Sequence, residues 1–76
     1  MPMSAWRTEN PAKPGVYVAR TRWVWWGLWR YWTGLWWSTG YWTRSGCQQA
    51  IDDFSAEGAD MPRAEQRIVD WREVLP

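Results

Sequence analysis

Residues 23–42 read WVWWGLWRYWTGLWWSTGYW. Eight of the ten tryptophans and two of the three tyrosines in the 76-residue chain lie in this stretch. Tryptophan and tyrosine favour the pleated, half-buried surface of a β-strand, and each ring can remove roughly 150–250 Å² from water. The stretch therefore predicts short strands whose side chains supply most of the apolar contact in the fold.

Glycines at positions 27, 34 and 40 divide this stretch into pieces of strand length. The Thr33-Gly34 pair lies between aromatic runs at 29–32 and 35–38. A pair ending in Gly at such a position indicates a hairpin turn, because Gly adopts the positive φ that a tight turn needs. Thr39-Gly40 repeats the pattern, so we expect a second hairpin there.

Adjacent aromatic residues interrupt the alternation of apolar and polar residues that a strand with one buried face shows. The pairs are Trp25-Trp26, Tyr31-Trp32, Trp36-Trp37 and Tyr41-Trp42. Each pair places an aromatic ring on both faces of its strand. One face can pack on the rest of the chain, and the other must meet a helix, another subunit, a ligand or water.

The remaining segments predict a small α+β fold. Residues 16–22 are expected to form a strand antiparallel to 28–32, with 23–27 as the connection, and 66–74 a last strand. A helix is expected at 45–57, with a Ser45/Gln48 capping box and Gly58 at its end. Its apolar stripe consists of Cys47, Ala50, Ile51 and Phe54.

We therefore predict an extended lead-in at residues 1–13, with Trp6 docked on the core, and one tryptophan-rich domain at 14–76. The domain is expected to be an antiparallel sheet of four to five strands with the helix packed on one face. A chain this short is marginally stable on its own, and aromatic residues on both faces favour self-association as a dimer.

Composition excludes several kinds of chemistry. The chain has no His and one Cys, so it can form neither an internal disulfide nor a zinc site of the usual type. Cys47 has no His to act as its base, and we interpret it as a buried structural residue. We expect no enzyme activity, no metal and no cofactor. We also expect no transmembrane segment and a reducing, cytoplasmic setting.

Charge is unevenly distributed along the chain. Residues 1–50 carry six basic residues against Glu9, a net charge of +5, whereas residues 51–76 carry three against seven acids, a net charge of −4. The two halves can attract each other, or the basic half can meet an anionic partner.

The strongest candidate site is the interleaving of Arg and Trp around the first hairpin connection. The predicted binding residues are Arg20, Arg22, Trp23, Trp25, Trp26, Arg30 and Trp37. Trp and Arg dominate protein–protein hot spots, and they also stack on bases and neutralise phosphates. The alternative is a structural role, with the rings in the core and guanidiniums stacked on them from outside. We favour that role for Trp29, Trp32, Trp36 and Trp71, and we also expect Trp37 and Trp42 to contribute to the core.

Three short motifs resemble a known group of proteins. They are the Pro-Gly-x-Tyr opening at residues 14–17, the Arg-Tyr-Trp-x-Gly-x-x-Trp hairpin at 30–37 and the Val-x-Trp-Arg ending at 69–72. The pattern is similar to short tryptophan-rich proteins of unknown function encoded by tailed phages and prophages. This chain departs from it at Thr33, where Asp is common, and in the extra cluster at 23–26.

The resemblance implies a small sheet with a helix, a phage origin and a place in the host cytoplasm. It supplies no functional residues. We expect a non-enzymatic protein that contacts and modulates or inhibits a host protein, for example a defence component. The alternatives are a nucleotide or single-stranded nucleic-acid binder, and a structural component of the virion or its assembly.

Overall fold

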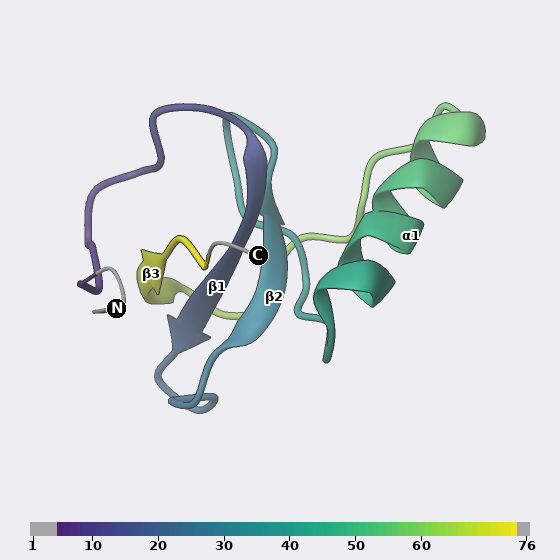
Figure 1. Ribbon diagram of the computed structural model, residues 1–76. Helices are drawn as coiled ribbons and strands as arrows, with labels where there is room; N and C mark the ends of the chain where they lie inside the picture. The colour runs from purple at the N-terminus through teal and green to yellow at the C-terminus, as the bar shows by residue number, and fades with distance from the viewer. Residues whose placement is uncertain (1–4, 75–76) are drawn as a thin grey trace.

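β-Branched and aromatic residues form three antiparallel strands, and the 13-residue segment that follows the tryptophan-rich stretch forms the helix (Figure 1). The computed structural model describes residues 5–74. Strands β1 (Gly15–Thr21), β2 (Leu28–Trp32) and β3 (Ile68–Arg72) pair in the order β2-β1-β3, and α1 spans Arg44–Ala56. The predicted α+β class is confirmed. The first four residues of the predicted lead-in and the last two of the predicted domain lie outside the described residues.

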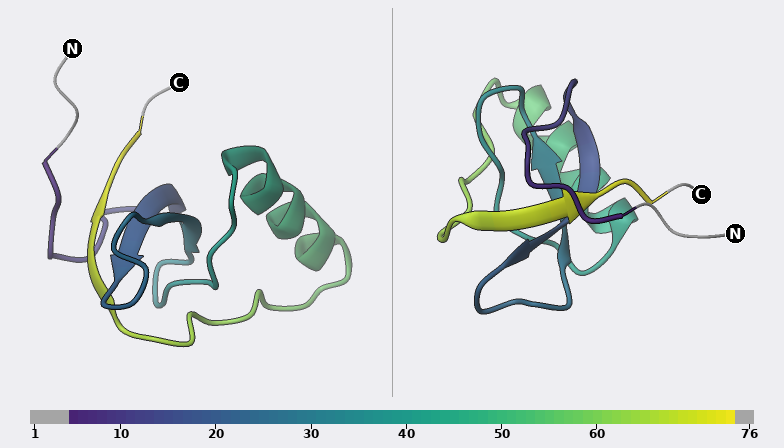
Figure 2. Two further views of the ribbon diagram at one scale, coloured as in Figure 1. Left: turned by 90° about the horizontal axis from the view of Figure 1, so that it is seen from below. Right: turned by 90° about the vertical axis from the view of Figure 1, so that its left-hand side faces the viewer.

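Strand β1 lies at the centre of the sheet and pairs with both neighbours. Tyr17 faces Arg30 across the β1–β2 hairpin, which confirms the predicted pairing and places residues 22–27 in the connection. Ala19 faces Trp71 across the β1–β3 pair, whose register shifts between Arg20 and Thr21. Strand β3 crosses the hairpin obliquely, and the segment around residue 7 runs beside it (Figure 2).

Both edges of the sheet are extended by single backbone bridges. On the outer edge of β2, Trp37 pairs with Trp32 and Tyr41 with Trp29, and on β3 Arg7 pairs with Trp71. The prediction of four to five strands exceeds the three that the structure shows in residues 5–74. Residues 37–41 shift register by one between these bridges, so they follow β2 without forming a continuous strand.

The two predicted hairpin turns have different outcomes. Gly34 has φ of 106° in a loop closed by the Thr33 N–H, which donates to the Trp36 carbonyl at 3.1 Å. At Gly40 the chain does not reverse, so the second hairpin prediction is wrong. A Cβ on Gly40 would lie 2.5 Å from Leu28 Cδ1. This glycine therefore allows close approach to β2, and no turn depends on it.

One face of the sheet carries an aromatic core. Tyr17, Ala19, Trp32 and Trp71 are buried there, and Trp37 and Ile68 pack against them. The Tyr17 ring meets the Trp71 ring edge-on at 4.8 Å and the Trp37 ring at 6.0 Å. Aromatic pairs favour such edge-to-face geometry. The predicted core roles of Trp32, Trp37 and Trp71 agree with this packing.

The opposite face of the sheet is partly covered by α1 and by the N-terminal segment. The Arg44 guanidinium at the start of α1 lies 4.8 Å from the Trp29 ring centroid. At the other side of this face, Trp6 stacks on Arg20 at 3.8 Å, as the predicted docking of Trp6 requires. Parts of the same chain thus cover some of the second aromatic face, and the predicted self-association as a dimer stays a prediction.

Local hydrogen bonds determine where α1 begins and ends. Thr43 is the N-cap, and its hydroxyl accepts from the Gly46 N–H at 2.9 Å. The prediction of a capping box at Ser45 is therefore wrong, because the N-cap lies two residues earlier. The chain is extended at Tyr41, where it pairs with β2, and the helix begins at Arg44. At the other end, Gly58 donates to Ser55 and Ala59 to Phe54, which is the Schellman arrangement expected for Gly58.

Candidate functional site

The connection between β1 and β2 carries three exposed tryptophans. The exposed fractions of Trp23, Trp25 and Trp26 are 68%, 70% and 50%. The turn is built locally: Val24 N–H donates to the Thr21 hydroxyl at 3.0 Å, and Gly27 N–H donates to the Val24 carbonyl at 3.2 Å. A connection that is closed so tightly is too short for its side chains to fold back onto the core. The rings therefore project from the end of the hairpin.

Trp42 is a fourth exposed ring at the same end of the molecule. Tyr41 pairs with Trp29, and the two segments run antiparallel, so Trp42 lies beside the start of β2 next to the connection. Its exposed fraction is 79%, and its predicted role in the core is wrong. The Tyr41-Trp42 pair puts one ring on each side of its segment, and the core is already filled by Trp32, Trp37 and Trp71.

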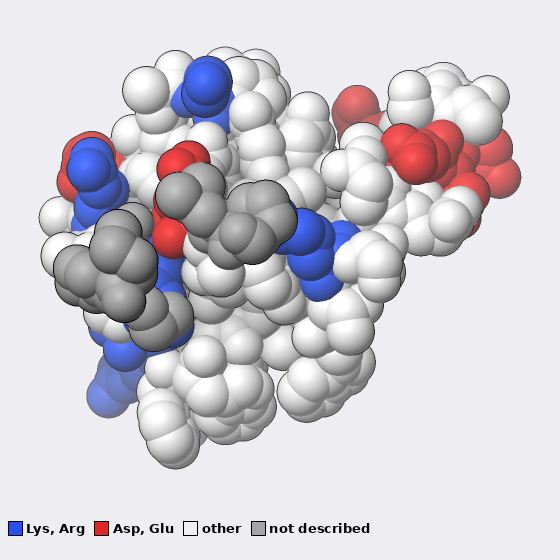
Figure 3. Space-filling model, in the orientation of Figure 1, with Lys and Arg blue, Asp and Glu red and all other residues white. Residues whose placement is uncertain are grey.

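We call these four residues, Trp23, Trp25, Trp26 and Trp42, the tryptophan end. The surface at the lower end of the view in Figure 3, where Figure 1 shows the β1–β2 connection, is mostly uncharged, with basic side chains at its left margin. Acidic side chains gather instead over α1, where Asp52, Asp53 and Glu57 are exposed. Trp25 and Trp26 meet edge-on at 5.7 Å, so part of this aromatic surface is ordered by its own contacts.

The three predicted binding arginines have different environments. Arg22 is exposed beside the tryptophan end, with its guanidinium 6.0 Å from the Trp23 ring. Arg20 forms a two-point ion pair with Asp70, at 2.7 and 2.5 Å, and these bonds raise the pKa of Arg20. This contact joins the basic half of the chain to the acidic half.

Arg30 lies inside the protein and has no exposed surface. Its Nη1 donates to the Ser38 carbonyl at 3.2 Å, and Nε and Nη2 have no hydrogen-bond partner among the described residues. Burial lowers the pKa of Arg30, because a low-dielectric interior disfavours its charge. The structure therefore removes Arg30 from the surface on which it was predicted to bind.

Two of the tryptophans for which a structural role is predicted, Trp29 and Trp36, are covered from outside by guanidiniums. Arg44 lies over Trp29, and Arg63 lies 4.8 Å from the Trp36 ring centroid. Both rings are partly buried, in agreement with the stacked structural role considered for them. Trp37, like Arg30, does not contribute to the predicted binding surface, because its ring packs against Trp32, Tyr17 and Trp71 in the core.

Cys47 is buried at the first turn of α1, and burial raises the pKa of its thiol to about 11. The thiol is therefore protonated at neutral pH, contrary to the lowering that a helix N-terminus can cause. In residues 5–74 no group of three or more His, Cys, Asp or Glu side chains is placed to hold a metal ion. No helix in that part of the chain is long and apolar enough to cross a membrane.

The chain matches no protein-family model, no curated protein and no solved structure. The geometry of the tryptophan end is therefore the basis for a functional assignment.

Proposed function

We propose that this protein is a non-enzymatic binding protein that contacts a host protein through the tryptophan end and modulates or inhibits it. The observation that carries the proposal is the exposure of four tryptophans, from two separate segments, at one end of the fold. The phage origin and the host partner rest on the sequence resemblance described above.

The size of this surface supports a protein partner. With roughly 200 Å² per ring, the four exposed fractions amount to about 500 Å² of aromatic surface. A standard protein interface buries about 800 Å² on each side, so these rings would supply more than half of one side. Exposed apolar area of this size on a small protein usually marks an interaction surface, because it otherwise promotes aggregation.

The chemistry of the surface also favours a protein. Trp is the residue most enriched in interface hot spots, and its two side-chain torsions make it inexpensive to immobilise. Trp25 and Trp26 already contact each other edge-on, which reduces the ordering that binding requires. Arg22 supplies a charged group at the rim, where it can orient a partner.

The nucleic-acid alternative has less support. It requires Arg20, Arg22 and Arg30 to neutralise phosphates beside stacked bases. Arg20 is paired with Asp70, and Arg30 is buried. Of the three, Arg22 alone is exposed, and one arginine gives a weak electrostatic footprint.

An affinity capture from bacterial lysate tests the proposal, with wild-type protein, the Trp25→Ala/Trp26→Ala double variant and a Leu35→Ala control. Leu35 is an apolar residue on the 33–36 loop that is even more exposed than Trp25 and Trp26. We expect the wild type and the control to retain the same protein after nuclease treatment, and the double variant to lose it. Equal capture by all three, or capture that disappears with nuclease, would refute the proposal.

A further inference from the structure

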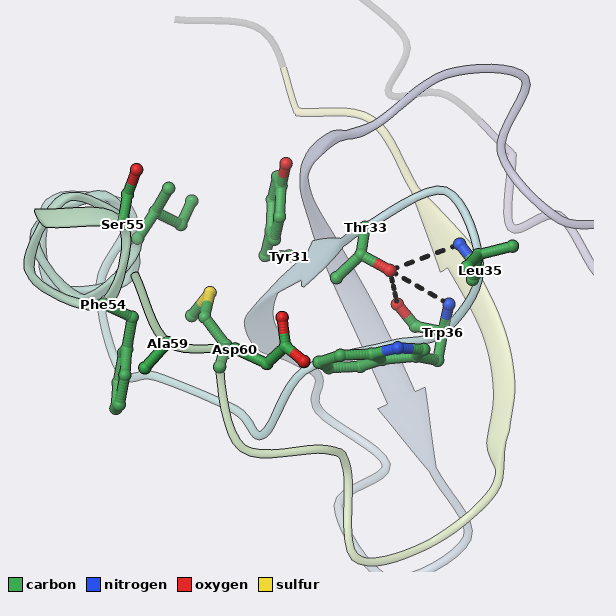
Figure 4. A pocket seen from close by; sticks show the side chains of 10 residues that line it. Tyr31, Thr33, Leu35, Trp36, Phe54, Ser55, Ala59 and Asp60 are labelled. Atoms are coloured by element: carbon green, nitrogen blue, oxygen red, sulfur yellow. Dashed lines mark hydrogen bonds between the residues drawn. The ribbon is translucent and has the colours of Figure 1, made fainter. Parts of the chain in front are cut away.

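A concave region lies away from the tryptophan end, between β2, the 33–36 loop and the C-terminal half of α1 (Figure 4). Its volume is about 430 Å³. Aromatic rings from three different elements line it: Tyr31 from β2, Trp36 from the loop and Phe54 from α1. None of these residues belongs to the surface proposed above for protein binding.

The Trp36 wall is held in place by its own loop. The Thr33 hydroxyl accepts from the Leu35 and Trp36 N–H groups, each at 3.2 Å, and it donates to the Trp36 carbonyl at 3.2 Å. Phe54 forms a second wall and belongs to α1. The C-terminal end of α1 is closed by the hydrogen bond that the Ala59 N–H donates to the Phe54 carbonyl. The cavity is therefore present before any ligand arrives.

The cavity carries a single formal charge. Asp60 is the one ionisable acid or base among its lining residues apart from the Tyr31 phenol. Figure 4 shows the Asp60 carboxylate pointing toward the Trp36 ring. Within residues 5–74 the ion pairs are Arg7–Glu9 and Arg20–Asp70, so Asp60 is in neither. Arg63 approaches Trp36 from the neighbouring cavity and does not line this one.

The three aromatic rings and the one carboxylate that line the cavity form an environment that attracts a cation. The face of an aromatic ring carries negative charge density, and a cation within about 6 Å of its centroid is attracted to it. The chain already shows this attraction at Trp36, whose ring has the Arg63 guanidinium 4.8 Å from its centroid. An ordinary ammonium is strongly hydrated, whereas a quaternary ammonium has no N–H groups and loses less hydration on entering.

We propose that this cavity binds a quaternary ammonium group, with Tyr31, Trp36 and Phe54 as its walls and Asp60 as its counter-charge. We call these four residues the aromatic cage. The aromatic cage is independent of the tryptophan end, so either assignment can fail without the other.

The test is a titration of the full chain with choline, followed by two-dimensional NMR, beside its neutral isostere 3,3-dimethyl-1-butanol. We expect choline to shift the Trp36 indole and Phe54 ring signals and to leave the Trp25 indole unmoved. The neutral isostere should bind more weakly by about tenfold, the factor that corresponds to roughly 1.4 kcal/mol of cation–π and charge attraction. Equal shifts with both compounds would show a merely apolar cleft and refute the proposal.

Two carboxylate variants make the test specific. Asp60→Asn should weaken choline binding by about fivefold, the effect of losing one partly screened charge contact. Asp52→Asn, the same change at an exposed position on α1 that does not line the cavity, should leave it unchanged. Both sites are exposed, so the fold should persist. No shift at about 50 mM choline, or equal loss in both variants, would overturn the assignment.

Nε-trimethyllysine in a third titration identifies the source of the group. Tighter binding than choline would indicate a modified side chain, and weaker binding a small choline-like metabolite. Either result supports the aromatic cage, whereas unmodified lysine binding as tightly as both would contradict the preference for a quaternary cation.

Discussion

The backbones of Trp29 and Tyr41 exchange two hydrogen bonds, with N–O distances of 2.9 and 2.8 Å. This pair joins the tryptophan-rich hairpin to the segment that leads into α1. It also places Trp42 beside the β1–β2 connection, so the exposed aromatic surface is assembled from two parts of the chain. The contact between these two residues is thus the structural reason that four tryptophans lie at one end.

The first prediction is that the tryptophan end contributes to binding and little to stability. Trp25→Ala and Trp42→Ala should leave the melting temperature near that of wild type, because both rings are more than two-thirds exposed. Loss of a hot-spot ring typically costs at least about 2 kcal/mol of binding, some thirtyfold in affinity. Thermal denaturation and affinity measurement on the captured partner check this, and a variant that unfolds would show that its ring belongs to the core.

The second prediction concerns the Cys47 thiol. Because burial raises its pKa to about 11, the thiolate is scarce at pH 7 and a thiol reagent should react slowly with folded protein. The neutral thiol is favoured in the folded state, so its contribution to stability is present below the unfolded pKa of about 8.5 and is lost as pH rises toward 11. Labelling of native protein as fast as that of urea-unfolded protein would contradict the buried position.

Replacement of Cys47 by Ala should cost about 1 kcal/mol of unfolding free energy, because it removes one buried atom from the helix–sheet contact. Binding by the tryptophan end should be unchanged. Loss of binding in a folded Cys47→Ala protein would show that the thiol has a role beyond packing.

The third prediction compares two carboxylates that form ion pairs. Asp70 is largely buried and accepts two bonds from Arg20, whereas Glu9 forms an exposed pair with Arg7. Asp70→Asn should lower the unfolding free energy by about 1.5–3 kcal/mol, whereas Glu9→Gln should lower it far less, because its pair is exposed and screened by solvent. Urea denaturation of both variants measures the difference, and equal values would contradict the structural role assigned to the Arg20–Asp70 pair.

The fourth prediction concerns the buried Arg30. Its Nε and Nη2 have no hydrogen-bond partner in the described part of the chain, so its charge is desolvated with little compensation. An apolar side chain of similar length avoids that penalty. Arg30→Met should therefore change the unfolding free energy by less than about 1 kcal/mol or increase it. A loss of more than about 3 kcal/mol would show that the guanidinium stabilises the core.

The sequence predicts the β1–β2 hairpin, β3 and the helix because each has a local pattern. Tyr17, Ala19 and Thr21 alternate with Val16 and Val18, and the buried side of β1 follows that alternation. The predicted number of strands was too high because of the aromatic runs after β2. Composition does not determine whether such a segment forms a single bridge or a continuous ladder. That outcome depends on Gly40 packing against Leu28, a tertiary contact.

The candidate site could be predicted in part. The exposure of Trp23, Trp25 and Trp26 follows from their place in a short hairpin connection. The prediction that Trp42 lies in the core is wrong, because its position depends on the pairing of Tyr41 with Trp29. The burial of Arg30 was missed for a related reason, since Arg at a strand position is usually exposed and its neighbour Ser38 belongs to a segment that follows no regular pattern.

The most direct test of the central claim is photo-crosslinking from defined positions on the protein surface. A benzoylphenylalanine placed at Trp25 or Trp42 keeps an aromatic ring in the tryptophan end, and the same residue at Asp53 lies on the exposed side of α1. After irradiation in bacterial lysate, we expect positions 25 and 42 to crosslink to one and the same host protein and position 53 to none. Crosslinks from position 53 alone, or from positions 25 and 42 only to a second copy of this chain, would contradict the proposal that the tryptophan end binds a host protein.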